Sequence, residues 1–206
     1  MPFPKPSRIA WLASLGAVLS FAAALVALLV WVPAYQPAQH PFALMGALRG
    51  AAAAWFNLAA FLVPGVLVGL ALALLPEGLT AGRAGGVGRQ LGMMAALGFV
   101  LMGVFPLDLD DLAGVGARAH GTVWMIWLAA VVPSALCLGV GAWRAGQQRV
   151  IGVASLLAGA LIGLLCLVGI GGLSGPSAQL LAWALWLGWI ALLARSGDKR
   201  MTAESI

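Results

Sequence analysis

Residues 9–32 read IAWLASLGAVLSFAAALVALLVWV, a run of 24 positions that contains no charged side chain. A helix rises about 1.5 Å per residue, so this run is long enough to cross a hydrocarbon core about 30 Å thick. It also exceeds the roughly 7–15 apolar residues of a cleaved signal peptide, which predicts an uncleaved signal-anchor after Lys5 and Arg8. The first stretch of the chain therefore predicts a membrane-spanning helix.

Five further apolar runs follow along the chain. The six predicted spans are residues 9–32, 50–75, 91–107, 121–143, 150–173 and 178–194. None of them alternates as barrel strands do, and inside a bilayer every backbone amide needs a partner within its own segment. No linker or charge run divides the chain. We therefore expect one domain over residues 1–206, an all-α bundle of six transmembrane helices.

The composition excludes several classes of protein. Hydrophobic residues make up 63% of the chain and charged residues only 8%, whereas soluble domains carry about 25% charged residues. This excludes a soluble enzyme, a nucleic-acid-binding domain and a disordered chain. The formal net charge of +5 then has to be explained by where the basic residues lie along the chain.

The basic residues concentrate on alternate loops. If the N-terminus lies inside, the nine on the inner side are Lys5, Arg8, Arg83, Arg89, Arg144, Arg149, Arg195, Lys199 and Arg200, and the two on the outer side are Arg49 and Arg118. This bias predicts that both termini are cytoplasmic in a multi-pass protein of the bacterial inner membrane. The basic side is expected to face anionic membrane lipids, with no role in binding nucleic acid.

Polar residues gather on the predicted outer side. The span centres contain no charged residue and no histidine, which argues against proton-coupled transport and voltage sensing. Asn57 is the only carboxamide well inside a span, about 11 Å below the outer end of span two. The residues expected to converge over the outer mouth of the bundle are His40, Arg49, Asn57, Asp108, Asp110, Asp111, Arg118 and His120.

Three interpretations of the outer cluster remain open. Asp108 or Asp110 would orient His120 as a general acid or base. Alternatively, the carboxylates and histidines would bind a divalent metal, although no close ligand pair such as HxxxH or CxxC is present. In the third interpretation the loop is only structural: Pro106 ends span three, aspartates cap backbone amides, and one aspartate pairs with Arg118.

Known motifs for other chemistries are absent from the sequence. It contains no P-loop, no dinucleotide-binding glycine motif, no redox CxxC and no serine-hydrolase elbow. Haem ligation is also not favoured, because neither of the two histidines lies within the body of a predicted span. No cofactor is therefore expected.

Small residues indicate where helices approach each other. The pairs Gly65-x-x-x-Gly69 and Gly159-x-x-x-Gly163 allow close backbone contact in lipid, which favours spans two and five as central helices. Pro64 lies inside span two, where it removes one backbone hydrogen bond and is expected to kink the helix.

Tryptophan and cysteine positions give two more packing predictions. Trp183, Trp186 and Trp189 repeat every three residues along one face of the last span, which favours lipid or helix packing over ligand stacking. Cys137 and Cys166 lie at depths that differ by about 15 Å. Because a disulfide needs Cα atoms within roughly 7 Å of each other, we expect no bond between them.

Several of these residues occur together in one known family. The series Tyr35 to Gly46, Trp55-Phe56-Asn57, Gly65, Gly69, Phe105-Pro106-x-Asp108 and His120-Gly121 resembles the bacterial and archaeal membrane family catalogued as domain of unknown function 998, over about residues 9–195. The resemblance implies a six-span helical bundle and no established reaction. Members often carry Ser-Glu-Leu-Gly in the first outer loop, where this chain has Ala43-Leu44-Met45-Gly46, so a catalytic role of that acidic residue would be lost here. A more distant likeness is to Frag/DRAM-type membrane proteins.

The sequence leads to one preferred function and two alternatives. We expect an outward-facing site that recognises a lipid head group or small amphiphile, with membrane lipids as the partners. One alternative is an interfacial hydrolase or transferase that uses Asp108 and His120 as an acid–base pair or as metal ligands; the other is a structural subunit of a membrane complex. The enzyme requires Asp108 and His120 to meet beside a cavity.

Overall fold

The computed structural model describes residues 5–48, 50–144 and 149–203, with side chains described as far as residue 196. All regular secondary structure in these residues is helical. Of the six long helical runs, four are unbroken α-helices and two contain a π-helical segment, written η. In chain order the elements are α1 (Pro6–Trp31), α2 (Leu44–Ala47), α3 (Ala51–Asn57), η1 (Leu58–Leu62), α4 (Val63–Ala73), α5 (Gly82–Val104), α6 (Val115–Arg144), α7 (Arg149–Gly163), η2 (Leu164–Val168) and α8 (Gly175–Ala203).

Six helices or continuous helical runs in the described residues are long and apolar enough to cross a membrane, with mean hydropathy between 1.5 and 2.6. They correspond to the six predicted spans, but several bounds differ. Helix α5 begins at Gly82 rather than 91, and α6 begins at Val115 rather than 121. Hydropathy ends a predicted span at an arginine, whereas a helix needs only backbone hydrogen bonds and continues through Arg83, Arg89 and Arg118.

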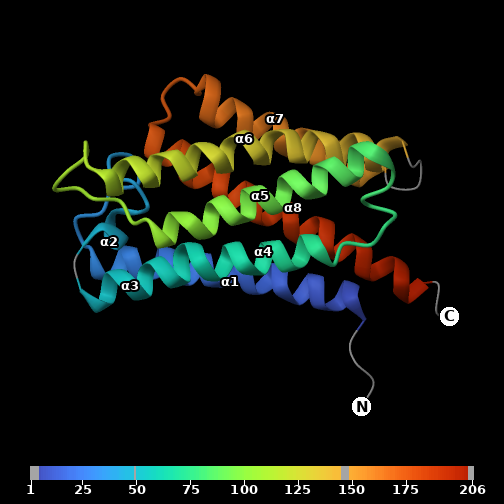
Figure 1. The fold of residues 1–206 in the computed structure, drawn as a ribbon, viewed down its shortest axis with the longest axis horizontal. Coiled ribbons are helices and arrows are strands. Elements are labelled where there is room, and N and C mark those ends of the chain that lie inside the picture. Colours follow the sequence, from blue (N-terminus) through green and yellow to red (C-terminus); the bar gives the residue numbers. More distant parts are fainter. Residues whose placement is uncertain (1–4, 49, 145–148, 204–206) are drawn as a thin grey trace, which may run out of the picture.

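The fifth span is shorter than predicted. It ends at Val168, and not near residue 173, because Gly169 adopts a positive φ of 80° and its N–H bonds to the carbonyl of Leu164. This helical run packs against α6 and α8 and lies at the edge of the bundle (Figure 1). The prediction that span five is central is therefore wrong, whereas α4 of span two contacts α1, α5 and α8.

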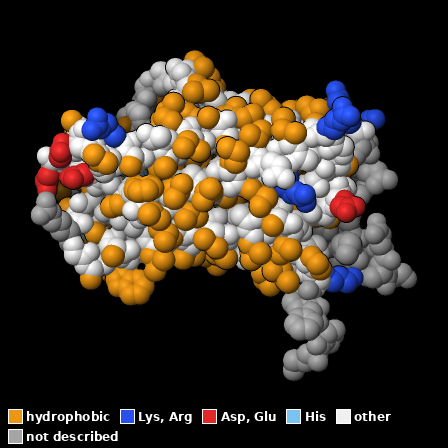
Figure 2. Space-filling view, in the orientation of Figure 1, with side chains coloured by type: hydrophobic (Ala, Val, Ile, Leu, Met, Phe, Trp, Pro, Cys, Tyr) orange, Lys and Arg blue, Asp and Glu red, His pale blue; other side chains and the backbone are white. Residues whose placement is uncertain are grey.

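The long helices run side by side, and the described ends of α1 and α8 that lead to the two termini lie at the same end of the bundle (Figure 1). We name this end the arginine end, since Arg8, Arg83, Arg144 and Arg149 lie there in α1, α5, α6 and α7. The opposite end carries the loop 105–114 with its three aspartates, and we name it the carboxylate end. Figure 2 shows most of the acidic groups clustered at the carboxylate end, and most of the basic groups at the arginine end, where an acidic group is also visible.

The centre of the bundle is an aromatic cluster. Phe61, Phe99 and Trp183 contact one another with ring centroids 5.3 to 5.6 Å apart. Trp183, Trp186 and Trp189 are all at most 3% exposed, so the packing role predicted for this stripe is confirmed. The full cluster consists of Phe21, Phe42, Phe56, Phe61, Phe99, Trp127, Trp183 and Trp186.

The most extensive helix contact joins α5 to α6 through glycines on α5. A Cβ atom at Gly88 would lie 2.7 Å from the backbone nitrogen of Leu138, and one at Gly98 would lie 3.1 Å from that of Trp127. The Ser134 hydroxyl on α6 donates a 2.7 Å hydrogen bond to the carbonyl of Gly88. Such small residues let two backbones approach in lipid, where packing drives association.

The two predicted glycine pairs contribute to helix contacts. A Cβ at Gly65 would lie 2.9 Å from the carbonyl oxygen of Ala96 on α5, and one at Gly159 would lie 3.1 Å from Cβ of Ala135 on α6. The first glycine of each pair is thus at a close helix contact.

Cys137 and Cys166 are both free thiols, which confirms that they form no disulfide.

Span two changes from α to π geometry just before its proline. The Val63 N–H bonds to the carbonyl of Leu58, five residues back, and the next residue, Pro64, has no N–H to donate. The wider turn of η1 therefore comes just before Pro64, where the helix lacks one backbone N–H donor. Asn57 is the last residue of α3, directly before η1, and π-helical turns of this kind are frequent at functional sites.

Candidate functional site

Asp108 organises the loop at the carboxylate end. Its Oδ1 accepts hydrogen bonds from the backbone N–H groups of Asp110 at 3.0 Å and Asp111 at 3.3 Å. The carbonyl of Asp111 in turn accepts a bond from the N–H of Gly114 at 3.0 Å. This is the geometry of an Asx turn, in which a short carboxylate stabilises its own loop.

His120 lies in the second turn of α6 and is only 7% exposed. Its Nδ1 is 2.8 Å from the carbonyl oxygen of Phe105; since a carbonyl only accepts, Nδ1 donates this bond. The imidazole also meets the Phe61 ring edge to face, with centroids 6.2 Å apart. Helix α6 begins five residues before His120, at Val115, so His120 belongs to this helix and not to the loop before it.

Asp108 and His120 therefore have separate hydrogen-bond partners. Asp108 bonds to loop amides and His120 to a backbone carbonyl. The described residues contain no group of three or more His, Cys, Asp or Glu side chains that could hold a metal ion. Arg118 is exposed in the first turn of α6, where its carbonyl accepts a 2.8 Å bond from the Thr122 hydroxyl. This arrangement matches the structural interpretation of the loop better than the acid–base interpretation.

His40 belongs to the loop between α1 and α2. Its Nδ1 accepts a 3.0 Å bond from the backbone N–H of Gln36, and its ring lies 6.1 Å from that of Tyr35. Burial raises the pKa of the Tyr35 phenol above its ordinary value. The same loop is tied to the start of α8, because the Ser177 hydroxyl donates a 3.0 Å bond to the carbonyl of Pro37. Arg49, the other residue predicted in this region, lies outside the described residues.

The loop after α1 also closes the carboxylate end with apolar side chains. Phe42 is 1% exposed, and its ring lies 4.7 Å from Phe21 and 5.8 Å from Trp183. Met45, in the short helix α2, is equally buried at 3%. The mouth predicted to be polar is thus filled by an aromatic side chain from the loop.

Asn57 differs from the other predicted residues in its surroundings. Its side chain is 8% exposed, and its Nδ2 donates a 3.0 Å hydrogen bond to the carbonyl of Gly46 in α2. A Cβ at position 46 would collide with the Asn57 carboxamide, with Oδ1 the nearest atom, so a larger residue there would displace the carboxamide. Within the described residues, Oδ1 of Asn57 accepts no hydrogen bond. A carboxamide can accept as well as donate, so one recognition atom remains available.

Asn57 lines a groove of about 450 Å³ between α3, η1 and the end of α5. We name it the Asn57 groove. Gly103 brings α5 close to span two, since a Cβ at this position would lie 2.9 Å from the carbonyl oxygen of Asn57. The remaining wall is apolar and includes Leu48, Ala54, Leu58, Leu62, Val104 and Pro106.

Sequence reasoning identified Asn57 but missed the residues that make its groove. Gly46 and Gly103 have no polar side chain, and the sequence gives no sign that they approach Asn57. The proline at position 64 was the available signal, because a missing donor allows a wider helical turn. Comparisons of the chain with family models, curated proteins and solved structures find no match.

Proposed function

We propose that this protein binds a lipid head group or a small amphiphile in the Asn57 groove. One observation carries the proposal: a nearly buried carboxamide with an unused acceptor lies in a groove whose walls are otherwise apolar. Ligand sites of this type combine a mostly apolar lining with a few placed polar groups. The Gly46 carbonyl accepts the hydrogen bond from Nδ2 and holds the carboxamide in place beside Gly46.

We further propose that the carboxylate end faces outward and that both termini are cytoplasmic, in a bacterial inner membrane. The distribution of basic residues supports this orientation. Arg118 is at the carboxylate end, whereas the arginine end holds Arg8, Arg83, Arg144, Arg149 and Arg195. Basic residues are enriched on the cytoplasmic side of membrane proteins. The Asn57 groove would then open toward the outer leaflet.

The chemistry of Oδ1 limits the class of ligand. An acceptor selects a head group that supplies an N–H or O–H donor, such as an ethanolamine, a glycerol or a sugar. The alkyl part of the ligand would lie along Leu58, Leu62 and Val104. A choline head group has no such donor and serves as the matched comparison.

The enzyme hypothesis receives less support from the structure. It needs Asp108 and His120 to interact, and the hydrogen bonds that each forms go to the backbone instead. The resemblance to domain of unknown function 998 is compatible with either function. A role as a structural subunit of a membrane complex stays a prediction, without a specific observation in its favour.

Native mass spectrometry of the purified protein tests the proposal. Phosphatidylethanolamine and phosphatidylcholine with identical acyl chains are titrated against the wild type, Asn57→Leu and Ala54→Leu. One hydrogen bond contributes about 0.5–1.5 kcal/mol, so we expect the wild type to prefer phosphatidylethanolamine about two- to tenfold and Asn57→Leu to lose this preference. Ala54→Leu narrows the groove without touching the Asn57–Gly46 bond and should weaken binding of both lipids.

The control is Gly188→Leu, which fills a different groove of about 400 Å³ between α7 and α8. A Cβ at Gly188 would meet no atom within 4 Å, so a side chain can start there without a clash. This variant should bind both lipids as the wild type does. Equal retention of the two lipids by the wild type, or an undiminished preference in Asn57→Leu, would refute the proposal.

A further inference from the structure

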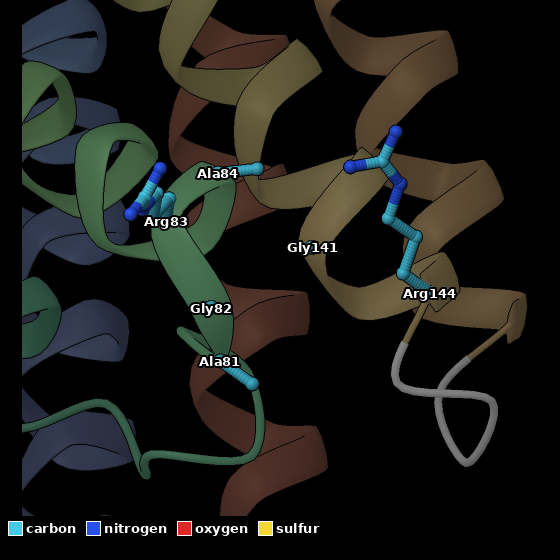
Figure 3. A pocket seen from close by; sticks show the side chains of 6 residues that line it. All are labelled: Ala81, Gly82, Arg83, Ala84, Gly141 and Arg144. Carbon is cyan, nitrogen blue, oxygen red and sulfur yellow. The ribbon is translucent and has the colours of Figure 1, made fainter.

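A second pocket lies at the arginine end, between the start of α5 and the end of α6. Its volume is about 430 Å³, within the range of about 300–1,000 Å³ that is usual for ligand sites. Figure 3 shows the lining residues. They are Ala81, Gly82, Arg83, Ala84, Gly141 and Arg144.

Small residues form the wall of this pocket. A Cβ at Gly141 would lie 2.9 Å from the backbone nitrogen of Gly85 and 3.3 Å from the carbonyl oxygen of Ala81, so α6 lies directly against the start of α5. Gly82 has a positive φ of 70°. Because the wall carries only hydrogen atoms or methyl groups between the two arginines, no protein side chain fills the space.

The charge at this pocket has no partner within the described residues. Arg83 of α5 and Arg144 of α6 lie on either side of Gly141 (Figure 3), and both are exposed. No hydrogen bond or ion pair of the described part of the chain involves either guanidinium. Glu77 of the preceding loop is exposed and is not part of the lining.

The start of α5 adds to the same positive field. Its N-cap residue, Ala81, makes no capping hydrogen bond, and the first turn contains no acidic residue. The first N–H groups of a helix have no partner within the helix and carry its positive dipole end. These groups support the site, but the cavity and its two arginines are what define it.

We propose that this pocket binds the phosphate group of an anionic phospholipid. Guanidinium groups form strong, geometrically specific hydrogen bonds with phosphate oxygens, and basic pockets between helices at the cytoplasmic surface accept anionic head groups. A lipid is favoured over a soluble phosphate because Trp143, which directly precedes Arg144 at the end of α6, is 48% exposed. Tryptophan at the end of a span is typical of the membrane interface.

Binding of phosphatidylglycerol to the purified full-length protein tests the inference, with phosphatidylcholine as the zwitterionic comparison of zero net charge. Each basic residue near a membrane surface contributes about a fivefold change in affinity. Arg83→Gln and Arg144→Gln should therefore each weaken phosphatidylglycerol binding about fivefold and leave phosphatidylcholine binding unchanged. The control is Arg195→Gln, which removes the same charge at the same end, where Arg195 lies 5.7 Å from the Trp11 ring.

Two further arms separate the pocket from general electrostatics. Ala84→Leu fills the pocket without changing the charge and should weaken phosphatidylglycerol binding as the arginine variants do. Inorganic phosphate is titrated as a competitor against the bound lipid. An equal loss of binding in Arg195→Gln and Arg144→Gln would overturn the inference. Arg144-dependent binding of inorganic phosphate, without any preference for phosphatidylglycerol, would overturn the assignment to a lipid. Because the pocket is remote from the Asn57 groove, either proposal can fail without the other.

Discussion

The two ends of the bundle use their polar residues differently. At the carboxylate end, Asp108, His120 and His40 each bond to a backbone group of their own loop or of a neighbouring one. At the arginine end, Arg83 and Arg144 line a pocket and have no partner within the described residues. The polar side chains of the carboxylate end therefore mainly stabilise its loops, whereas the two arginines of the arginine end can bind a ligand.

This difference shows why the density of polar residues is a poor guide to function in this fold. The carboxylate end collects three aspartates and a buried histidine, yet the groove at this end is lined by Asn57, whose Oδ1 accepts no hydrogen bond within the described residues. Buried polar groups of a membrane protein pair with neighbouring backbone or side-chain groups, so their presence alone does not mark a binding site.

Phe42→Ala should produce the largest loss of stability, because it removes the aromatic side chain that closes the carboxylate end. Removing a fully buried phenylalanine costs about 3–5 kcal/mol, and Phe42 contacts Phe21, Phe61 and Trp183. The measurement is thermal unfolding in detergent. Trp143→Ala at the arginine end is the control; this side chain is 48% exposed and should cost far less. Equal losses would mean that the two ends are packed alike.

His120→Ala should cost about 1–3 kcal/mol, since it removes a side chain that is only 7% exposed together with its hydrogen bond to the carbonyl of Phe105. The same unfolding assay measures this loss. Arg118→Ala, two residues earlier on the exposed surface of α6, should change stability by less than about 0.5 kcal/mol. If His120→Ala were as stable as Arg118→Ala, the hydrogen bond to Phe105 would not hold the carboxylate end together.

Asp108→Ala should cost about 1 kcal/mol, the usual value for loss of a carboxylate that caps backbone amides. Asp108→Asn keeps an acceptor oxygen for the amides of Asp110 and Asp111 and should be nearly neutral. Comparing the two variants separates a structural role from a role that requires the negative charge. A loss in Asp108→Asn as large as that in Asp108→Ala would favour the charged interpretations of this loop.

The alkaline titration of Tyr35 gives the smallest and most local test. Tyr35 is the only tyrosine in the chain, so tyrosinate absorbance reports on it alone. Burial raises its pKa, so the folded state holds the phenol proton more tightly than the unfolded state does. Its contribution to stability is therefore complete below the unfolded pKa of about 10 and is lost as the pH rises through the folded pKa. The midpoint should lie above that of the denatured protein, with Tyr35→Phe as the blank. A midpoint equal in both states would show that the loop after α1 is open to water.

The sequence predicts the architecture well because one physical requirement dominates it. Runs such as residues 9–32 cannot be accommodated in water, and six of them occur. The helix bounds are less predictable, since α5 and α6 extend into turns that contain Arg83, Arg89 and Arg118. Hydropathy indicates where the chain is apolar, but it does not indicate where backbone hydrogen bonding stops.

The sites are only partly predictable for a different reason. Asn57 is visible in the sequence because a carboxamide is rare inside a span. Its partner Gly46 and the insertion of Phe42 depend on how a loop folds back on the bundle, and loop sequence does not specify this. In the sequence, Arg83 and Arg144 indicate only how the protein is oriented in the membrane. Their shared pocket depends on the glycine contacts between α5 and α6, which appear only in three dimensions.

The π-helical turn η1 makes span two sensitive to the length of the chain. Such a turn accommodates one more residue than a regular α turn, so a deletion of one residue between Leu58 and Leu62 would restore a regular helix. Each residue of an α-helix advances the chain by about 100° around the axis. The π turn absorbs this advance for its extra residue, so the deletion would leave Asn57 and Gly65 close to their present directions, with their contacts to Gly46 and α5. A homologue that is one residue shorter in this segment is expected to retain the bundle and the Asn57–Gly46 hydrogen bond, and to differ in the wall that Leu58 and Leu62 give to the Asn57 groove.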